Sequence, residues 1–205
     1  MRKIIGIFGI QGHGKTTYLK EITKNLNRVI YVDTLEEYNY KTITNPIELL
    51  DFLKDRISFK IEYVNLTEDT DIESLDKVCI AIKSYIQYMQ SKYELDIDIT
   101  LAVDEVDIYA TTSFISQNFR ELIVRGRHWN TNLIYATRRP HECNRLLTSQ
   151  SNIFAIFKII EPSDIAFFKT FIGEYAYELP ELKRFEYLYC DLDSQIFIKK
   201  KLQND

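Results

Sequence analysis

The sequence predicts an α/β fold with a central, mostly parallel sheet flanked by helices and a C-terminal β-hairpin. Three observations support this prediction. Strand and helix patterns alternate along most of the chain, a glycine-rich loop joins the first strand to the first helix, and two short strand patterns flank a polar turn near the end. Strands that alternate with helices typically form a parallel sheet covered on both faces. Because the 205 residues contain no linker or internal repeat, we expect a single domain spanning residues 1–205.

Apolar runs and capping patterns define the elements of the first half. The predicted strands cover residues 3–8, 28–33 and 59–66. The predicted helices begin at Thr17, at Asn45 and at Thr70, the last continuing to about Tyr93. Asn45 is a favourable N-cap, and Pro46 suits the first helical position. Thr70 and Glu73 have the spacing of a capping box.

The second half repeats the alternation and then changes character. Further strands are predicted at residues 97–103, 132–137 and 152–160, with a mostly helical segment at 114–129. Ser163 and Asp164 are expected to cap a short helix. Residues 185–190 and 195–199 flank the polar turn 191–194, which predicts a β-hairpin.

The glycine-rich loop runs from Gly9 to Thr16 and matches the Gly-x-x-x-x-Gly-Lys-Thr pattern of a phosphate-binding P-loop. Such a loop points its backbone N–H groups at a polyphosphate, and the following helix N-terminus adds partial positive charge. We expect Lys15 to reach the β- and γ-phosphates and the Thr16 hydroxyl to bind Mg²⁺. The predicted nucleotide-binding residues are Gly9, Gln11, Gly12, His13, Gly14, Lys15, Thr16 and Thr17.

A second acidic motif follows the apolar strand that ends at Val103. Asp104 stands at the strand tip, where it is expected to hold Mg²⁺ beside Thr16. Glu105 is the next residue and is expected to orient the water that attacks the γ-phosphate. Together with the P-loop, these carboxylates predict a RecA-like P-loop NTPase that uses ATP and Mg²⁺.

Composition limits the function classes. No apolar run approaches the roughly 20 residues of a membrane span, and the chain enters its first strand without a signal peptide, so a secreted protein is not expected. The cysteines Cys79, Cys143 and Cys190 lack metal-ligand spacing and indicate free thiols in a reducing compartment. The net charge of −4 indicates that any contact with DNA is local or shared among several subunits.

Arginines gather between residues 120 and 145. The segment contains six arginines and two acidic residues, and arginine is suited to bidentate phosphate contacts. Arg138 and Arg139 follow a predicted strand, so they are expected at the same sheet edge as the P-loop and Asp104. A solvated face with surface ion pairs is the alternative interpretation for any single arginine.

Residues 122–140 resemble the corresponding region of the FtsK–HerA superfamily, whose members are ring-forming motors that move DNA. In that family a helix ending in Arg-Gly-Arg leads to a strand ending in Thr-Gln-Arg-Pro. Here Arg125-Gly126-Arg127 leads to Thr137-Arg138-Arg139-Pro140. With the P-loop and the Asp104-Glu105 pair, the resemblance covers about residues 3–172. The small size resembles the viral genome-packaging branch, and the length and layout most resemble the packaging NTPases of turreted icosahedral archaeal viruses.

The resemblance implies an ATP-hydrolysing motor that translocates double-stranded DNA and packages a viral genome into a preformed capsid. It implies a homo-oligomeric ring, a hexamer or pentamer, with DNA in its pore. It also implies a place in the host cytoplasm or at the virion vertex, with capsid-vertex or internal-membrane proteins as docking partners. Arg125 or Arg127 of a neighbouring subunit is expected to complete the catalytic site in trans.

One position departs from the family pattern. Arg138 stands where the family usually has a glutamine that senses the γ-phosphate. Arg138 is expected either to contact that phosphate or to turn toward a neighbouring subunit. Thr137 is the alternative polar sensor.

Two other functions fit the motifs. A P-loop kinase for nucleotides or small molecules would use arginines such as Arg138 and Arg139 as a lid over an acceptor pocket. A nucleotide-gated assembly protein would bind ATP with little turnover. A phosphorylated acceptor would identify the kinase, and absent phosphate release would identify the assembly protein.

Overall fold

The computed structural model describes residues 2–34, 36–54, 56–65 and 70–202. Within these residues the chain forms one nine-stranded sheet in the order β3-β4-β2-β5-β6-β1-β7-β8-β9. The strands are β1 (Ile4–Phe8), β2 (Arg28–Val32), β3 (Lys41–Ile43), β4 (Phe59–Tyr63), β5 (Ile99–Val103), β6 (Thr131–Thr137), β7 (Ile153–Ile156), β8 (Glu186–Asp191) and β9 (Ile196–Lys201). Every neighbouring pair from β3 through to β7 in this order is parallel. β8 is antiparallel to both of its neighbours, β7 and β9. The predicted α/β fold with a C-terminal hairpin is confirmed.

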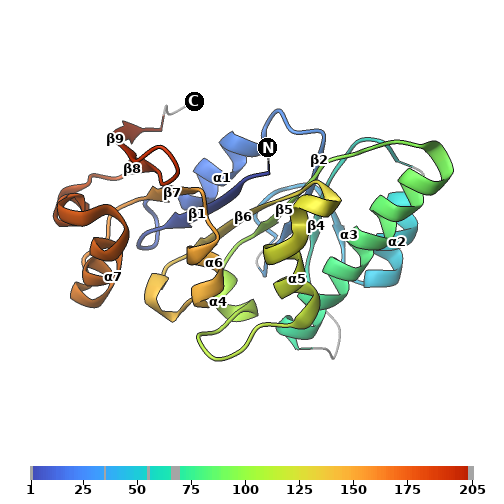
Figure 1. Cartoon of the computed structure of the whole chain (residues 1–205), viewed down its shortest axis with the longest axis horizontal. Coiled ribbons are helices and arrows are strands. Elements are labelled where there is room, and N and C mark those ends of the chain that lie inside the picture. The colour runs from blue at the N-terminus through green and yellow to red at the C-terminus, as the bar shows by residue number, and fades with distance from the viewer. Residues whose placement is uncertain (1, 35, 55, 66–69, 203–205) are drawn as a thin grey trace.

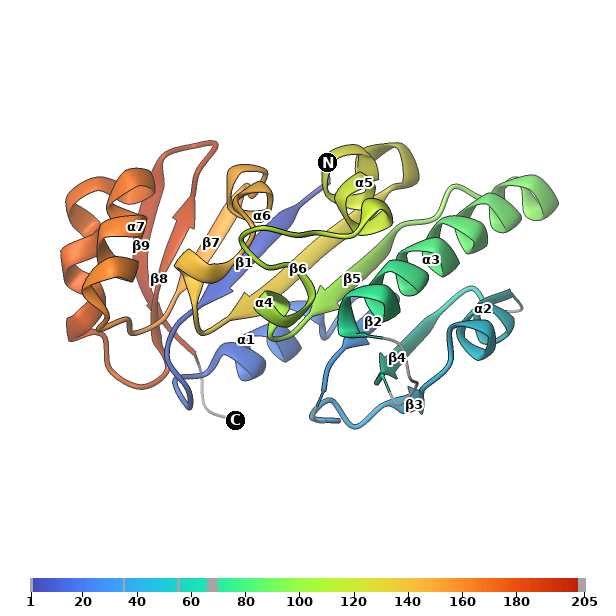
Figure 2. The same ribbon diagram turned by 90° about the horizontal axis from the view of Figure 1, so that it is seen from below.

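Helices cover both faces of the sheet. The α-helices are α1 (Lys15–Thr23), α2 (Pro46–Lys54), α3 (Asp71–Tyr93), α4 (Val106–Tyr109), α5 (Gln117–Arg125), α6 (Arg145–Ser149) and α7 (Pro162–Ile172). Three 3-10 helices are η1 (Gly126–Trp129), η2 (Pro140–Glu142) and η3 (Gly173–Glu181). Helix α1 lies on one face, while α3, α4, α5 and α6 lie on the other (Figure 1 and Figure 2). None of the helices in the described ranges has the length and apolar character needed to cross a membrane.

The packing differs between the two faces. The larger hydrophobic cluster fills the space under α2, α3, α5 and α7, and a smaller one lies under α1, around Leu19. In the larger cluster, the ring of Phe8 makes edge-to-face contacts with the rings of Tyr135, Phe154 and Phe168. Phe8 is the last residue of β1, so these contacts fix the strand end from which the P-loop departs.

The central position of β1 explains where the functional segments meet. β1 pairs in parallel with β6 on one side and β7 on the other, and Phe8 is level with Thr137 at the end of β6. β5 lies on the far side of β6. The carboxyl ends of β1, β5 and β6 therefore share one sheet edge, which is where ligands bind in open parallel sheets.

Two predicted helix caps are confirmed. The Thr70 side chain accepts a hydrogen bond from the backbone N–H of Glu73, and the Glu73 carboxylate accepts one from the Thr70 N–H. The Asn45 Oδ1 accepts from the Ile47 N–H at 2.8 Å, at the start of α2. Both pairs satisfy backbone donors that a helix leaves without an intrahelical partner.

Other predicted details need correction. Helix α7 starts at Pro162 after Glu161, and Asp164 does not cap it. The Asp164 carboxylate is buried and accepts hydrogen bonds from the backbone and ring of His141 instead. The strand predicted at 152–160 is limited to β7. The strand predicted at 59–66 ends at Tyr63 in the structure, while residue 66 lies outside the described residues. Strand β3 was not predicted.

Candidate nucleotide-binding site

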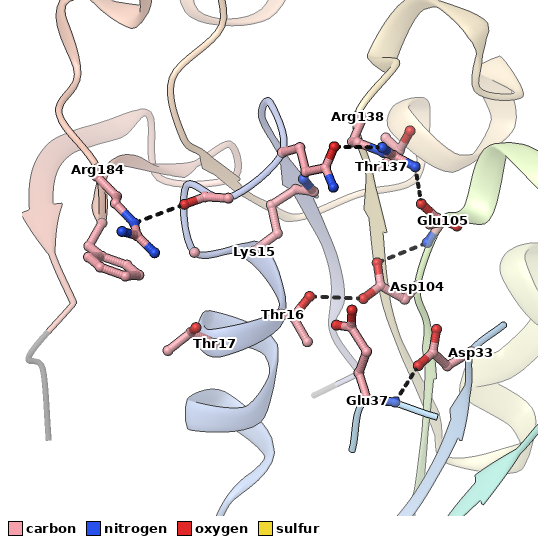
Figure 3. Close-up of a pocket in the computed structure, with 14 residues that line it drawn as sticks. Lys15, Thr16, Thr17, Asp33, Glu37, Asp104, Glu105, Thr137, Arg138 and Arg184 are labelled. Carbon is pink, nitrogen blue, oxygen red and sulfur yellow. Dashed lines mark hydrogen bonds and ion pairs between the residues drawn. The ribbon is translucent and has the colours of Figure 1, made fainter. Parts of the chain in front are cut away.

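A cavity of about 370 Å³ opens at the carboxyl ends of β1, β5 and β6. It brings together the P-loop, the acidic pair after β5 and the end of β6 (Figure 3). The lining residues are Gln11, Gly12, Gly14, Lys15, Thr16, Thr17, Asp33, Glu37, Asp104, Glu105, Thr137, Arg138, Arg184 and Phe185. Thr16 and Asp104, which are 88 residues apart in sequence, and Gln11 and Arg138, which are 127 apart, thus meet at one site, as expected for strands that end at one edge.

The P-loop has a backbone that requires glycine at three of its positions. Gly9 has a φ of +145°, and a Cβ there would lie 2.6 Å from Cβ of Phe157. Gly12 and Gly14 have φ of +75° and +111°, in the range that residues with a Cβ rarely adopt. A Cβ on Gly14 would also lie 2.8 Å from Cδ1 of Phe185. The Gly14 carbonyl accepts the N–H of Tyr18 at 2.8 Å and so begins the hydrogen bonding of α1.

Lys15 lies inside the loop. Its Nζ donates to the carbonyls of Gly9 at 2.9 Å and Ile10 at 3.2 Å. Burial lowers the pKa of the Lys15 ammonium, and the nearby Asp104 carboxylate opposes that effect. The ammonium is therefore partly desolvated, which strengthens its attraction for a phosphate oxygen.

Two further P-loop residues, Gln11 and His13, contact different parts of the chain. The Gln11 Oε1 accepts from Nη1 of Arg138 at 3.4 Å. The His13 ring lies 3.0 Å from the Gln11 carbonyl, and the His13 carbonyl accepts from the Phe185 N–H. Thr17 is exposed on the first turn of α1 and lines the cavity.

Thr16 and Asp104 are neighbours, as the sequence predicts for a magnesium site. The Thr16 hydroxyl donates to the Asp104 carboxylate at 3.2 Å. The Tyr38 hydroxyl donates to the same oxygen at 2.9 Å. Burial raises the pKa of the Asp104 carboxyl, and the hydrogen bond from Tyr38 opposes this rise.

These donors fit Mg²⁺. Mg²⁺ is usually held by one or two protein oxygens together with substrate phosphates and waters. The Thr16 hydroxyl and the Asp104 carboxylate supply two such oxygens beside the P-loop. In the part of the chain that the structure describes, no group of three or more His, Cys, Asp or Glu residues could hold a metal ion.

Glu105 has an unusual backbone. Its φ of 48° and ψ of 47° are in the left-handed region, which is uncommon for a residue with a side chain. Its carboxylate forms an ion pair with Arg138 and accepts a hydrogen bond from the Thr34 hydroxyl at 3.4 Å. Strained backbone of this kind concentrates at functional sites, where surrounding structure enforces it.

The two candidate γ-phosphate sensors at the end of β6, Thr137 and Arg138, differ in whether their side chains are free to reach a ligand. The Thr137 hydroxyl donates to Asp107 at 2.6 Å and accepts from the Arg139 N–H at 2.9 Å, so its hydrogen bonds are internal. The Arg138 side chain is 46% exposed and reaches from Gln11 to Glu105 across the cavity. This geometry favours Arg138 as the group that can turn toward a phosphate.

Arg125 and Arg127 lie away from the cavity. Arg125 ends α5 and Arg127 lies in η1, just before the amino end of β6, so they are at the opposite edge of the sheet from the P-loop. Both are exposed. One chain therefore does not bring them to its own P-loop. A role in catalysis requires a neighbouring subunit and stays a prediction.

Close packing against Arg2 requires glycine at position 126, between these arginines. A Cβ at this position would lie 2.7 Å from the Arg2 guanidinium. That guanidinium donates to the carbonyls of Ile123 and Thr131, each at 2.7 Å, and to Leu122. Burial lowers the pKa of Arg2 to about 10. Arg2 thus ties the end of α5 to the start of β6.

The sequence did not reveal several residues of the site. Asp33, Glu37, Arg184 and Phe185 line the cavity, and Tyr38 contacts Asp104. Asp33 follows β2, the neighbour of β5, so its position after a strand was a usable signal. The others lie in loops and carry no motif, so their approach to the P-loop depends on tertiary packing.

The chain has the RecA-like P-loop NTPase fold, and the cavity lies at its P-loop. A scan of the sequence with protein-family models finds no match, and a search of curated proteins finds none either. Solved structures do match. The genome packaging NTPase B204 from Sulfolobus turreted icosahedral virus 2, in complex with AMP, is 18% identical with a TM-score of 0.78, covering 98% of both chains.

Two further structures extend the comparison. The DNA-packaging ATPase B204 from Sulfolobus turreted icosahedral virus is 19% identical with a TM-score of 0.77, again covering 98% of both chains. VirB4 of Thermoanaerobacter pseudethanolicus is 12% identical with a TM-score of 0.65, covering 98% of this chain and 89% of its own. The chain has the fold of these three proteins.

Proposed function

We propose that this protein is an Mg²⁺-dependent ATPase of the viral branch of the FtsK–HerA superfamily. In this proposal it translocates double-stranded DNA and packages a viral genome into a preformed capsid. The observation that carries the ATPase part is the convergence of Lys15, the Thr16–Asp104 pair and Glu105 in one cavity. Two viral packaging enzymes with the same fold and nearly the same length support the motor part.

The residues have separate roles in hydrolysis. The P-loop amides and Lys15 bind the phosphates, and Thr16 and Asp104 hold Mg²⁺. When bound, Mg²⁺ neutralises charge that develops on the β- and γ-phosphate oxygens. The Glu105 carboxylate accepts a hydrogen bond from water and aligns it with the γ-phosphorus. A bond forms from the water oxygen to this phosphorus, the bond to the ADP oxygen breaks, and ADP and inorganic phosphate leave.

Arg138 connects substrate binding to the release of Glu105. In the structure its guanidinium is paired with the Glu105 carboxylate. An arriving γ-phosphate carries more negative charge than one carboxylate and competes for the guanidinium. Arg138 then turns to the phosphate, and Glu105 becomes free to orient water. Arg138 therefore takes over the sensing role that the family usually assigns to glutamine.

A ring supplies what a single chain lacks. Arg125 and Arg127 lie at the amino edge of the sheet, and the cavity lies at the carboxyl edge. In a head-to-tail ring the amino edge of one subunit faces the cavity of the next, so one of these arginines enters the neighbouring site. Several copies of a modest basic patch would bind DNA in the pore despite a net charge of −4 per chain.

Phosphate release with and without duplex DNA tests the proposal. We expect Mg²⁺-dependent release of phosphate from ATP that duplex DNA stimulates, and we expect Glu105→Gln to abolish it while ATP binding remains. Glu48→Gln, on the exposed surface of α2, is the matched control and is expected to leave release unchanged. Release that is absent from the unmodified chain under all conditions would contradict the ATPase. Release that duplex DNA leaves unchanged in an assembled ring would contradict the translocase.

A further inference from the structure

The cavity has two ends, separated by the P-loop. Figure 3 shows Glu105, Thr137 and Arg138 on one side of the loop and Arg184 on the other. A triphosphate in the P-loop directs its terminal phosphate toward Asp104 and Glu105. A nucleoside that extended in the other direction would meet Arg184 and Phe185.

Arg184 and Phe185 are fixed against the P-loop backbone. The Arg184 Nε donates to the Gly12 carbonyl at 3.1 Å, and the Phe185 N–H donates to the His13 carbonyl at 3.2 Å. The Arg184 guanidinium carbon lies 4.7 Å from the centre of the Phe185 ring. A planar cation and an aromatic ring are thereby held together at the edge of the cavity.

The close approach of the Phe185 ring to the P-loop depends on the backbone at both Gly14 and Phe185. Gly14 has no Cβ, and one would lie 2.8 Å from the ring. Phe185 has a φ of 66°, which is a rare backbone conformation for an aromatic residue. Its carbonyl accepts the Leu202 N–H at 2.9 Å, just beyond the end of β9. A strained conformation held from two sides is characteristic of a functional position.

We infer that Arg184 and Phe185 form the surface on which the nucleotide base stacks. The inference rests on the proposed binding of a nucleoside triphosphate in the P-loop, and it gives the residues just before the C-terminal hairpin a role in substrate binding. Stacking on a ring and a guanidinium is tolerant of base identity, because every base presents a π-face. ATP and GTP are therefore expected to bind with affinities within roughly threefold of each other.

Isothermal titration calorimetry with ADP and with inorganic pyrophosphate tests the inference. Both probes occupy the phosphate site, and ADP alone carries a base. Phe185→Leu keeps apolar bulk against Gly14 and removes the ring, so we expect roughly tenfold weaker ADP binding and unchanged pyrophosphate binding. Arg184→Lys removes the planar guanidinium and is expected to weaken ADP alone, while Phe185→Tyr retains both affinities.

Two controls separate this inference from the proposed function. Lys15→Ala is expected to weaken ADP and pyrophosphate together, because it acts on the phosphates. Phe114→Leu changes an exposed phenylalanine outside the cavity and is expected to change neither affinity. Unchanged ADP affinity in Phe185→Leu, or equal loss for both probes, would overturn the stacking surface alone. Failure of the unmodified chain to bind either probe would overturn the proposed function as well.

Discussion

Arg138 occupies the position where the sequence departs from the FtsK–HerA pattern that it resembles, and its contacts suggest a measurable consequence. The side chain is paired with Glu105 and contacts Gln11. We expect Arg138→Gln to bind ADP as the unmodified protein does and to bind a non-hydrolysable ATP analogue roughly tenfold more weakly. The reason is that a charge-assisted hydrogen bond to the γ-phosphate is lost, and ADP has no such group. Calorimetric titration with both nucleotides measures the ratio.

The adjacent arginine provides the control for this variant. Arg139 is exposed and paired with Glu142 outside the cavity. Arg139→Gln should leave the ratio of the two affinities unchanged. If Arg138→Gln weakens ADP and the ATP analogue equally, Arg138 contacts another part of the nucleotide and the sensing role is wrong.

Asp104 gives the site a pH dependence that Tyr38 modifies. In the proposed mechanism Mg²⁺ binds the ionised carboxylate, and burial raises the pKa of this group above that of an ordinary aspartate. The gain in ATP affinity from Mg²⁺ should therefore fall on acidification at a higher pH than an exposed aspartate would give. The hydrogen bond from Tyr38 lowers the pKa, so Tyr38→Phe should move this fall to a still higher pH. Titrations across a pH series measure the midpoint.

A conservative change at the surface completes this test. Asp51 is exposed on α2, where it pairs with Lys54. Asp51→Asn should leave the midpoint unchanged, and Asp104→Asn should remove the effect of Mg²⁺ at every pH. A midpoint that moves to lower pH in Tyr38→Phe would contradict the assignment of Asp104 as the metal ligand.

At the scale of elements, the P-loop packs against Phe185, just before the C-terminal hairpin. Substitutions at two P-loop glycines distinguish the cost of backbone strain from the cost of steric overlap with this ring. Gly12→Ala places a Cβ at positive φ, where it meets none of the described atoms within 4 Å. We expect it to lower the free energy of unfolding by roughly 1 kcal/mol. Gly14→Ala adds overlap with the Phe185 ring, so we expect a loss of roughly 3 kcal/mol. Urea denaturation measures both.

The double variant Gly14→Ala with Phe185→Ala tests the cause of the larger loss. Removing the ring relieves the overlap and leaves the backbone strain, so the double variant should lose less than the sum of the two single changes. Equal losses of unfolding free energy for Gly12→Ala and Gly14→Ala would show that overlap with the Phe185 ring does not contribute to the destabilisation.

The sequence predicted the elements that depend on local patterns and missed those that depend on packing. The P-loop and the Asp104-Glu105 pair were found because each has a fixed spacing after an apolar strand. Strand β3 is only three residues long at the sheet edge, too short for an alternating pattern. Asp164 was assigned to a helix cap because its residue type suits one. Its burial beside His141 could not be read from neighbouring residues.

At the scale of the whole molecule, the separation of Arg127 from the P-loop allows a complementation test. Lys15→Ala and Arg127→Ala should each reduce ATP turnover in the proposed ring by roughly a hundredfold or more. In an equal mixture half of the sites carry Lys15, and half of these face a subunit with Arg127. About a quarter of the unmodified turnover should therefore return. Phosphate release from mixed and unmixed preparations measures the recovery.

A double variant controls for subunit mixing. Chains that carry both Lys15→Ala and Arg127→Ala should restore nothing when mixed with Arg127→Ala chains. The same pair of experiments with Arg125→Ala identifies which arginine acts in trans. Turnover that recovers with neither arginine variant would mean that the trans group is a different residue.

The position of β1 has a consequence for how this protein is made. β1 leaves the ribosome before the other strands of this sheet, yet both of its partners, β6 and β7, are synthesised more than 120 residues later: Ile4 pairs with Leu133, and Ile5 with Ile153. This apolar strand is therefore synthesised well before both of its neighbours. Folding that depends on strand pairings so far apart in sequence is slow and passes through aggregation-prone intermediates. We expect nascent chains that stop before β7 to require chaperones and to resist any attempt to purify them as a soluble nucleotide-binding fragment.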